Sequence, residues 1–264
     1  MSYIELGGLV LGAGLIAAFV CVLLHRLLHH DTFRRYHEVG HAVFLQLGVI
    51  FAVLLAFVFN NVWSNYNVAS QAIDSECGSL HGIAILSDRL PAPARAMILD
   101  GLRAYLTTVL DREWLDMQQR NESQTADGRF QSLWQAAETV DMDPADSQIR
   151  GQLLNLLATA HQSRETRLYQ MRQGVPGLIW SLLIIFAFAL IGCMLVFAAE
   201  ASLSKAVLVG VFTSSLTLAL LTVRMLDFPF ESALQLSSRD FNQTLKKIDR
   251  LIAAAQPHGS RPSE

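Results

Sequence analysis

The sequence predicts an all-α integral membrane protein, with four transmembrane helices and a helical extramembrane domain between the second and the third. Charged residues make up only 16% of the chain, whereas soluble domains carry roughly 25%. Four segments contain no charged residue. Each of them has, or nearly has, the roughly 20 apolar residues that a helix needs to cross a bilayer. No segment alternates between apolar and polar residues as a half-buried β-strand does.

The four uncharged segments are Leu6–Leu24, Ala42–Trp63, Val175–Ala199 and Ala206–Val223. The last one reaches spanning length because its apolar run continues to Leu226. The start of the chain is acidic, at Glu5, and the first apolar run is longer than that of a signal peptide, so we interpret it as a retained anchor. Gly8 and Gly12 form a small-xxx-small pair that lets another membrane helix approach closely, unless they only reflect the usual glycine content of such helices.

The spans divide the chain into four parts. These are residues 1–66, with the first two spans and a basic, histidine-rich loop; 67–174, the extramembrane helical domain; 175–230, a hairpin of spans three and four; and 231–264, a polar C-terminal tail. The connections within the two pairs of spans are expected at His25–His41 and Glu200–Lys205.

The extramembrane part is expected to be helical throughout. No helix breaker follows the second span until Pro91, so this span is expected to continue as one long helix to about Leu90. Apolar residues at helical spacing predict further helices over about 94–120 and 129–140 and from Asp143-Pro144 onward, with a polar loop at 121–128. Pro229 is expected to end the fourth span.

The composition also limits the classes of molecule that the protein is expected to bind. The formal net charge is −3, which gives no indication of nucleic-acid binding, and the spans make the lipid bilayer the expected environment. The three cysteines, Cys21, Cys77 and Cys193, have no metal-ligand spacing, and their odd number argues against a disulfide framework. We expect no cofactor. Lysine and arginine counts near the spans do not decide which side of the membrane the domain occupies.

The segment His37–His41 reads His-Glu-Val-Gly-His and fits the helical zinc motif of metalloproteases, with Glu38 as the base. Intramembrane proteases of the site-2 type carry it together with an aspartate motif, both inside the membrane. Here the matching aspartate, Asp100, falls in the extramembrane domain. We therefore expect no metal site and no enzyme, and keep a metal site at His37, Glu38 and His41, with Asp31 or His30 as third ligand, as the alternative.

A set of short segments stands in a fixed order between His37 and Phe241. They are His37–Gly40, Gly48–Phe57, Val62-Trp63, Tyr66, Ala69, Glu76, Leu90-Pro91, Tyr105, Glu113-Trp114, Arg164, Arg167-Leu168, Pro176, Trp180 and Asp227–Phe230. In this order and at similar spacing, they resemble the bacterial bestrophin-like family of membrane proteins. The resemblance accounts for His37, Glu38 and Gly40 without zinc, whereas His41 is not part of the family pattern.

The family resemblance implies a distant likeness to bestrophins, which are pentameric anion channels with four spans per subunit. Their second span lines the pore, and a cytoplasmic helical region separates spans two and three. For this chain the resemblance implies a homo-oligomeric channel for an anion in the cell (inner) membrane, with both termini and the helical domain in the cytoplasm. A non-transporting scaffold or regulator that acts through the helical domain is the alternative, and a metalloprotease is a third.

The second span supplies the candidate pore residues. Phe57 and Phe59 lie near its extramembrane end, followed by Asn60 and Asn61. Phe57 and Asn61 are four residues apart and share a helix face, which favours them over Asn60 as the lining pair. In a ring of subunits, phenylalanines form a gate by dewetting and asparagine amides replace part of the hydration shell of an anion. The alternative is that both asparagines simply lie at the membrane interface beside Trp63.

Arg224 and Asp227 are the two charged residues at the end of the fourth span. They are three residues apart, so a continuing helix would place them on one face as an ion pair at the membrane edge. We expect a structural role for this pair; the alternative is that each is simply a snorkelling or interfacial group at the span end.

Overall fold

The computed structural model of the chain describes residues 3–27, 37–139, 147–197, 203–231 and 234–255, and over these residues it contains helices and no strand. Four helices are long and apolar enough to cross a membrane: Ile4–Leu24, Gly40–Arg89, Gly177–Val196 and Leu203–Leu226. The predicted fold class is thereby confirmed. The chain forms two compact units, a membrane unit (Met1–Asn65, Gly174–Phe228 and Ser232–Leu234) and a helical unit (Tyr66–Gln173, Pro229–Glu231 and Gln235–Glu264).

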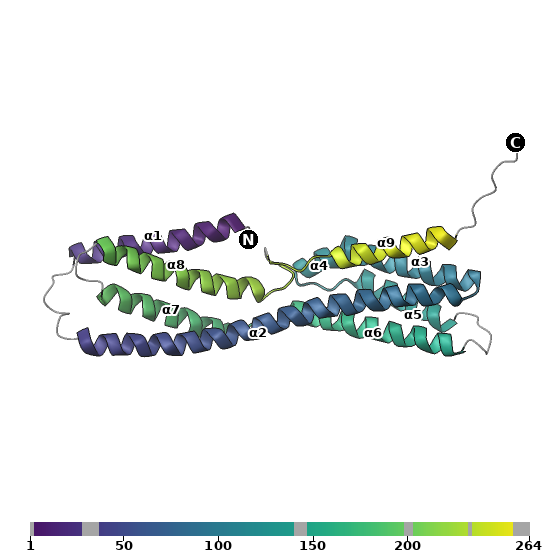
Figure 1. Cartoon of the computed structure of the whole chain (residues 1–264), viewed down its shortest axis with the longest axis horizontal. Coiled ribbons are helices and arrows are strands. Elements are labelled where there is room, and N and C mark those ends of the chain that lie inside the picture. Colours follow the sequence, from purple (N-terminus) through teal and green to yellow (C-terminus); the bar gives the residue numbers. More distant parts are fainter. Residues whose placement is uncertain (1–2, 28–36, 140–146, 198–202, 232–233, 256–264) are drawn as a thin grey trace, which may run out of the picture. The chain divides into compact units, whose positions relative to one another are not determined.

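The membrane unit is built from α1 (Tyr3–Leu27), the first part of α2 (His37–Leu86), α7 (Gly177–Phe197) and α8 (Leu203–Leu226). Helices suit these segments because hydrocarbon offers no partner for backbone N–H and C=O groups, which a helix pairs internally. α1 lies along α8, and α7 also contacts α8 (Figure 1). α2 and α8 begin at His37 and Leu203, inside the connections that we expected to be non-helical. No proline interrupts these starts, and Gly40 in the first turn of α2 is tolerated because helix extension costs little once a helix exists.

The contact between α1 and α8 depends on glycine. A Cβ atom added at Gly14 would lie 2.8 Å from the carbonyl oxygen of Gly210, and one added at Gly210 would lie 3.1 Å from the carbonyl oxygen of Gly14. The Ser214 hydroxyl of α8 donates a hydrogen bond to the Val10 carbonyl of α1 at 3.2 Å. Small residues therefore bring the two backbones together, and a polar side chain joins them, as is common between membrane helices.

Gly8 and Gly12 take no part in the contact between α1 and α8. A Cβ atom at either position would meet nothing within 4 Å. Both positions lie outside the face of α1 that contacts α8, because they are not at helical spacing from Gly14 on that face. The close approach of α1 and α8 therefore depends on Gly14 and Gly210, and the packing role of Gly8 and Gly12 toward another helix stays a prediction.

The helical unit contains the second part of α2 and seven further elements. These are η2 (Ser87–Arg89), α3 (Ala92–Thr108), the π-helical turn η3 (Val109–Glu113), α4 (Trp114–Gln118), α5 (Gln124–Thr139), α6 (Ser147–Arg172) and α9 (Arg239–Ala255). α3 packs on α5 and α9, and α5 packs on α6 (Figure 1). The predicted apolar positions form its core: Ile98, Leu102, Tyr105, Phe130, Leu133, Leu153 and Leu157 are all buried.

Helix boundaries in this unit differ from expectation at two places. The helix predicted over 94–120 contains the π turn η3, and the predicted polar loop at 121–128 is shorter because α5 begins at Gln124. The α4 end is closed by a turn with Arg120 at φ 60°, in which Asn121 N–H donates to the Asp116 carbonyl at 2.9 Å. This is the bond of a Schellman motif, which normally uses glycine at the left-handed position. The expected helix start at Asp143-Pro144 lies outside the described residues.

Gly14→Val tests the close approach of α1 and α8. The added side chain must push the two backbones apart, so we expect a lower melting temperature for the full chain in detergent and a loss on the order of 2 kcal/mol, as for other overpacked contacts. Gly12→Val is the matched control, since its side chain enters open space. Equal melting temperatures for the two variants would contradict the role of Gly14.

Candidate functional site

One face of α2 inside the membrane unit is not covered by the other described helices. We call it the α2 stripe; its members are Ile50, Val53, Phe57, Asn60, Asn61 and Ser64, all exposed. Their spacing of three and four residues places them on one side of the helix. The buried residues Phe51, Val58 and Val62 lie on the other side. The side chain of Phe57 is 72% exposed, although it is large and apolar.

The α2 stripe changes in character along the helix. It begins with the apolar residues Ile50, Val53 and Phe57 and continues with two amides and a hydroxyl at Asn60, Asn61 and Ser64. Phe57 and Ser64 are separated by about 10 Å along the axis at 1.5 Å per residue. An apolar constriction followed at once by uncharged polar groups is a combination found in ion pathways.

Phe59 does not belong to the α2 stripe. It lines a groove of about 550 Å³ between α2 and α8, together with Leu55 and Thr222, and its ring stacks on that of Trp63 with centroids 6.4 Å apart. The structure therefore brings Phe57 and the two asparagines to one exposed face and turns Phe59 toward α8. Sequence proximity alone did not separate the two phenylalanines.

Arg224 and Asp227 have other partners in place of the expected ion pair. α8 ends at Leu226, and the Asp227 N–H still donates to the Val223 carbonyl at 3.0 Å, so the helical spacing holds but the carboxylate is directed to α7. The Asp227 carboxylate accepts hydrogen bonds from the backbone N–H of Val175 at 2.7 Å and from Trp180 Nε1 at 3.2 Å, which ties the start of α7 to the end of α8. The Arg224 guanidinium lies over the Phe228 ring, 4.4 Å from its centroid.

No described residue supplies a further metal ligand to the metalloprotease motif at His37–His41. α2 begins at His37, so the motif is helical, but the side chains of His37 and Glu38 lie outside the description. His41 is exposed, and Asp100 is exposed on α3 in the helical unit. Among the described residues no three His, Cys, Asp or Glu side chains gather closely enough to hold a metal ion.

The helical unit contains a buried ionic cluster that the sequence analysis did not recognise as one. Its members are Glu76 of α2, Tyr105 of α3, Glu113 of η3, and Arg164 and Arg167 of α6. Arg167 donates to Glu76 through Nε at 2.9 Å and to Glu113 through Nη2 at 3.0 Å. Arg164 donates to Glu113 at 2.8 Å, and the Tyr105 hydroxyl donates to Glu76 at 2.6 Å. The two buried carboxylates balance the two guanidiniums in charge, and Arg164 also donates to the half-exposed Asp127 at 3.1 Å.

The π turn η3 helps to bring Glu113 into this cluster. Tyr105, Val109, Glu113 and Met117 are spaced by four residues and all lie on the buried side. In a regular α-helix this spacing would drift around the axis, by about 40° for every four residues at 3.6 residues per turn. A π turn, closed by bonds between residues five apart, holds more residues and reverses part of that drift. Glu113 therefore faces the same interior as Tyr105.

In the buried ionic cluster, burial and the neighbouring arginines shift the pKa values of the carboxyl groups in opposite directions. Burial raises the pKa of Glu76 above its usual range, and Arg167 only partly offsets this effect. Burial acts in the same sense on Glu113, but Arg167 and Arg164 together hold its pKa below the usual range. The pKa of the Tyr105 hydroxyl is raised well above its usual value, chiefly by burial, so it remains a donor. Because every contact to the carboxylates comes from a donor, the geometry fits ionised Glu76 and Glu113.

A signal for this cluster was present in the sequence. The apolar residues of α6 that face the core, Leu153, Leu157 and Ala160, are followed at the same helical spacing by Arg164 and Arg167. An arginine that continues an apolar stripe is expected to be buried and paired. The carboxylate partners, however, lie 51 to 91 residues away along the chain, and only the fold brings them to α6.

Glu113→Gln tests the buried ionic cluster. It leaves two buried guanidiniums with one carboxylate of the cluster, so we expect a loss of about 3 kcal/mol in the unfolding free energy of the full chain in detergent, followed by near-UV circular dichroism. The control is Glu122→Gln, which removes an exposed ion pair with Arg172 and is expected to cost less than about 1 kcal/mol. Similar losses in the two variants would contradict a structural role for the cluster.

The effect of Glu113→Gln on the unfolding free energy should also depend on pH. Because the folded-state pKa of Glu113 is lowered from 4.5, its stabilising contribution is present above that pH and is lost as the pH falls through the folded-state pKa. Glu113→Gln should therefore lack this part of the acid destabilisation. The raised pKa of Glu76 acts with the opposite sign, since its contribution falls as the pH rises through the folded-state pKa.

Comparisons with known proteins agree with the fold. The chain resembles the crystal structure of a bacterial bestrophin homolog from Klebsiella pneumoniae with a TM-score of 0.70 and 14% identity, covering 93% of this chain and 98% of that one. A variant of that homolog gives a TM-score of 0.72 at 13% identity, with the same coverage. At this identity the likeness concerns the fold. A comparison with curated proteins finds no match. Residues 12–241 match the model of the Bestrophin-like domain, and the chain therefore belongs to the Bestrophin-like domain family.

Proposed function

We propose that the chain is one subunit of a homo-oligomeric anion channel in the cell membrane, with the α2 stripe of each subunit lining the pore. The observation that carries this proposal is the exposure of Phe57 and Asn61 on one uncovered face of a membrane-spanning helix. Asparagine amides are costly in hydrocarbon, so this face calls for water or a polar partner in place of lipid. A ring of subunits around an aqueous path supplies both.

The proposed selectivity follows from the chemistry of the stripe. An amide group offers two N–H donors, and an anion that passes the ring exchanges part of its hydration shell for these donors. The ring carries no net charge, so an anion is held loosely enough to leave. Phe57 closes the path next to the amides, where an apolar ring expels water. We place the helical unit and both termini on the cytoplasmic side, as the bestrophin resemblance implies.

Phe57→Ala tests the constriction. Removing the ring of aromatic side chains should lower the dewetting barrier, and we expect anion flux into vesicles reconstituted with the full chain to rise on the order of tenfold, which corresponds to roughly 1.4 kcal/mol. Phe188→Ala is the matched control, because Phe188 is 70% exposed on α7 and not on the α2 stripe. It should leave the flux unchanged. If wild type and Phe57→Ala both conduct no more than empty vesicles, the channel proposal fails and a scaffold or regulator takes its place.

Asn61→Ala tests the polar ring. We expect a changed preference among chloride, bromide and nitrate, since the variant lacks the amide donors that replace part of the hydration shell. Asn60→Ala should have the smaller effect, because Asn60 is offset around the helix from the line that joins Phe57 and Asn61. Permeability ratios from reversal potentials provide the measurement. Ratios that move more in Asn60→Ala than in Asn61→Ala would assign the lining role to the other asparagine.

A further inference from the structure

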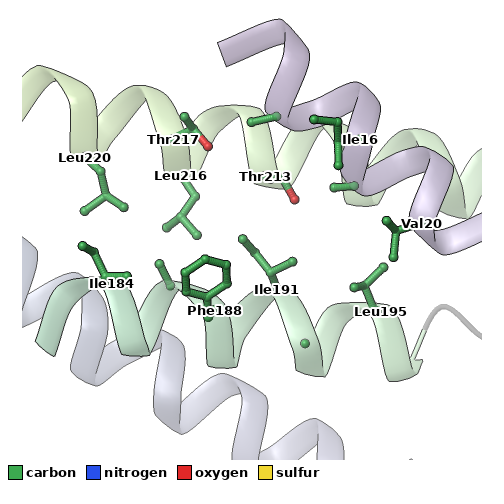
Figure 2. Close-up of a pocket in the computed structure, with 14 residues that line it drawn as sticks. Ile16, Val20, Ile184, Phe188, Ile191, Leu195, Thr213, Leu216, Thr217 and Leu220 are labelled. Atoms are coloured by element: carbon green, nitrogen blue, oxygen red, sulfur yellow. The ribbon is translucent and has the colours of Figure 1, made fainter. Parts of the chain in front are cut away.

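A pocket of about 730 Å³ opens between α1, α7 and α8 in the membrane unit, away from the α2 stripe. Its volume is within the range of small-molecule sites. The walls are almost wholly apolar, with Ile16 on α1, Phe188 and Ile191 on α7, and Leu216 on α8 (Figure 2). The wall formed by α7 includes Gly192, where an added Cβ atom would meet nothing within 4 Å. The glycine thus leaves room that a side chain would fill.

Two hydroxyls, those of Thr213 and Thr217, line this apolar wall, and Thr213 is the one that is buried without a partner. Thr213 is only 4% exposed, and its Oγ1 atom is buried without a hydrogen bond to any described residue. Other hydroxyls of the same helix are satisfied by their own backbone: Ser215 donates to Val211 at 2.9 Å and Thr222 to Leu218 at 2.8 Å. In Figure 2 the Thr213 side chain points from α8 toward the pocket, opposite Ile191. A buried hydroxyl without a partner is uncommon and calls for an explanation.

The position of Thr213 along α8 restricts what can pair with it. It lies roughly 15 Å from the first residue of α8 and roughly 20 Å from the last, at 1.5 Å per residue. This places it deep in a hydrocarbon core about 30 Å thick. A charged group at that depth is costly, and a ligand donor bonded to the Thr213 oxygen would leave the Thr213 O–H without an acceptor. The fitting ligand group is therefore a neutral acceptor, of which a carbonyl oxygen is the simplest.

We propose that this pocket binds a neutral, lipid-soluble carbonyl compound, whose hydrocarbon part lies against Phe188 and Ile191 and whose oxygen accepts a hydrogen bond from Thr213 once rotation about χ1 turns the buried hydroxyl to the pocket surface. The ligand enters from the bilayer, because the exposed side chains of Ile16 and Phe188 border the opening. The ester carbonyls of a phospholipid at its usual depth lie near the membrane surface and do not reach Thr213. The site does not depend on ion conduction.

The test uses the full chain in detergent micelles and the photoreactive ketone para-octylbenzophenone, whose excited carbonyl inserts into nearby C–H bonds. We expect saturable labelling of the peptides of α7 and α8 that line the pocket. Thr213→Val keeps the shape but removes the hydroxyl, and should weaken binding about fivefold, the usual effect of one hydrogen bond. Thr222→Val is the matched control and should bind as wild type does. Gly192→Phe fills the pocket and should abolish the labelling.

A competition experiment separates carbonyl recognition from simple filling by hydrocarbon. In wild type, unlabelled para-octylbenzophenone should displace the probe at lower concentration than para-octyldiphenylmethane, which has CH₂ in place of the carbonyl. In Thr213→Val the two competitors should be equal. Equal competition in wild type would overturn the proposed hydrogen bond. Labelling outside the pocket peptides, or labelling that persists in a folded Gly192→Phe, would overturn the site itself. The Thr213→Val result stands even if Gly192→Phe does not fold.

Discussion

A polar group that is taken out of water must find a partner, and most of this structure follows from that constraint. In the membrane unit it leaves helices as the only form for the spans, because a helix pairs its own backbone groups. The Asp227 carboxylate at the end of α8 obeys the same rule by accepting from Val175 and Trp180. In the helical unit the four charges of the buried ionic cluster are all paired, and removing one partner leaves a charge that the interior cannot solvate.

The same constraint makes polar side chains that lack a hydrogen-bond partner useful indicators of binding sites. Asn60 and Asn61 are exposed on a membrane-spanning helix where lipid offers no hydrogen bond, which is the physical argument for an aqueous path along the α2 stripe. Thr213 is buried without a partner beside an apolar pocket, which is the argument for a ligand with a carbonyl group. The two proposed sites lie on different helices and differ in kind, since the proposed pore requires several subunits and the proposed ligand pocket is lined by a single chain.

The family resemblance and the tertiary structure explain one another at several positions. Glu76, Tyr105, Glu113, Arg164 and Arg167 stand in the sequence as isolated members of a family pattern, and the fold brings all five into one cluster. Trp180 and Asp227 belong to the same pattern and form a hydrogen bond between α7 and the end of α8. Residues of the pattern that are far apart along the chain therefore meet in polar contacts within the fold, which gives a physical reason for their joint presence.

Hydropathy and helical spacing alone determined the four spans, the long second helix and the core positions of the helical unit such as Ile98, Leu102 and Leu153, because these depend on local patterns of a few turns. They also placed Phe57 and Asn61 on one helix face. Only the tertiary structure decided that Gly14 and not Gly12 meets α8, that Phe59 turns toward α8, that Arg224 and Asp227 take separate partners, and that Arg164 and Arg167 meet Glu76 and Glu113. Each of these depends on which side chain of a distant segment comes within about 3 to 4 Å, and spacing within one helix carries no information about that.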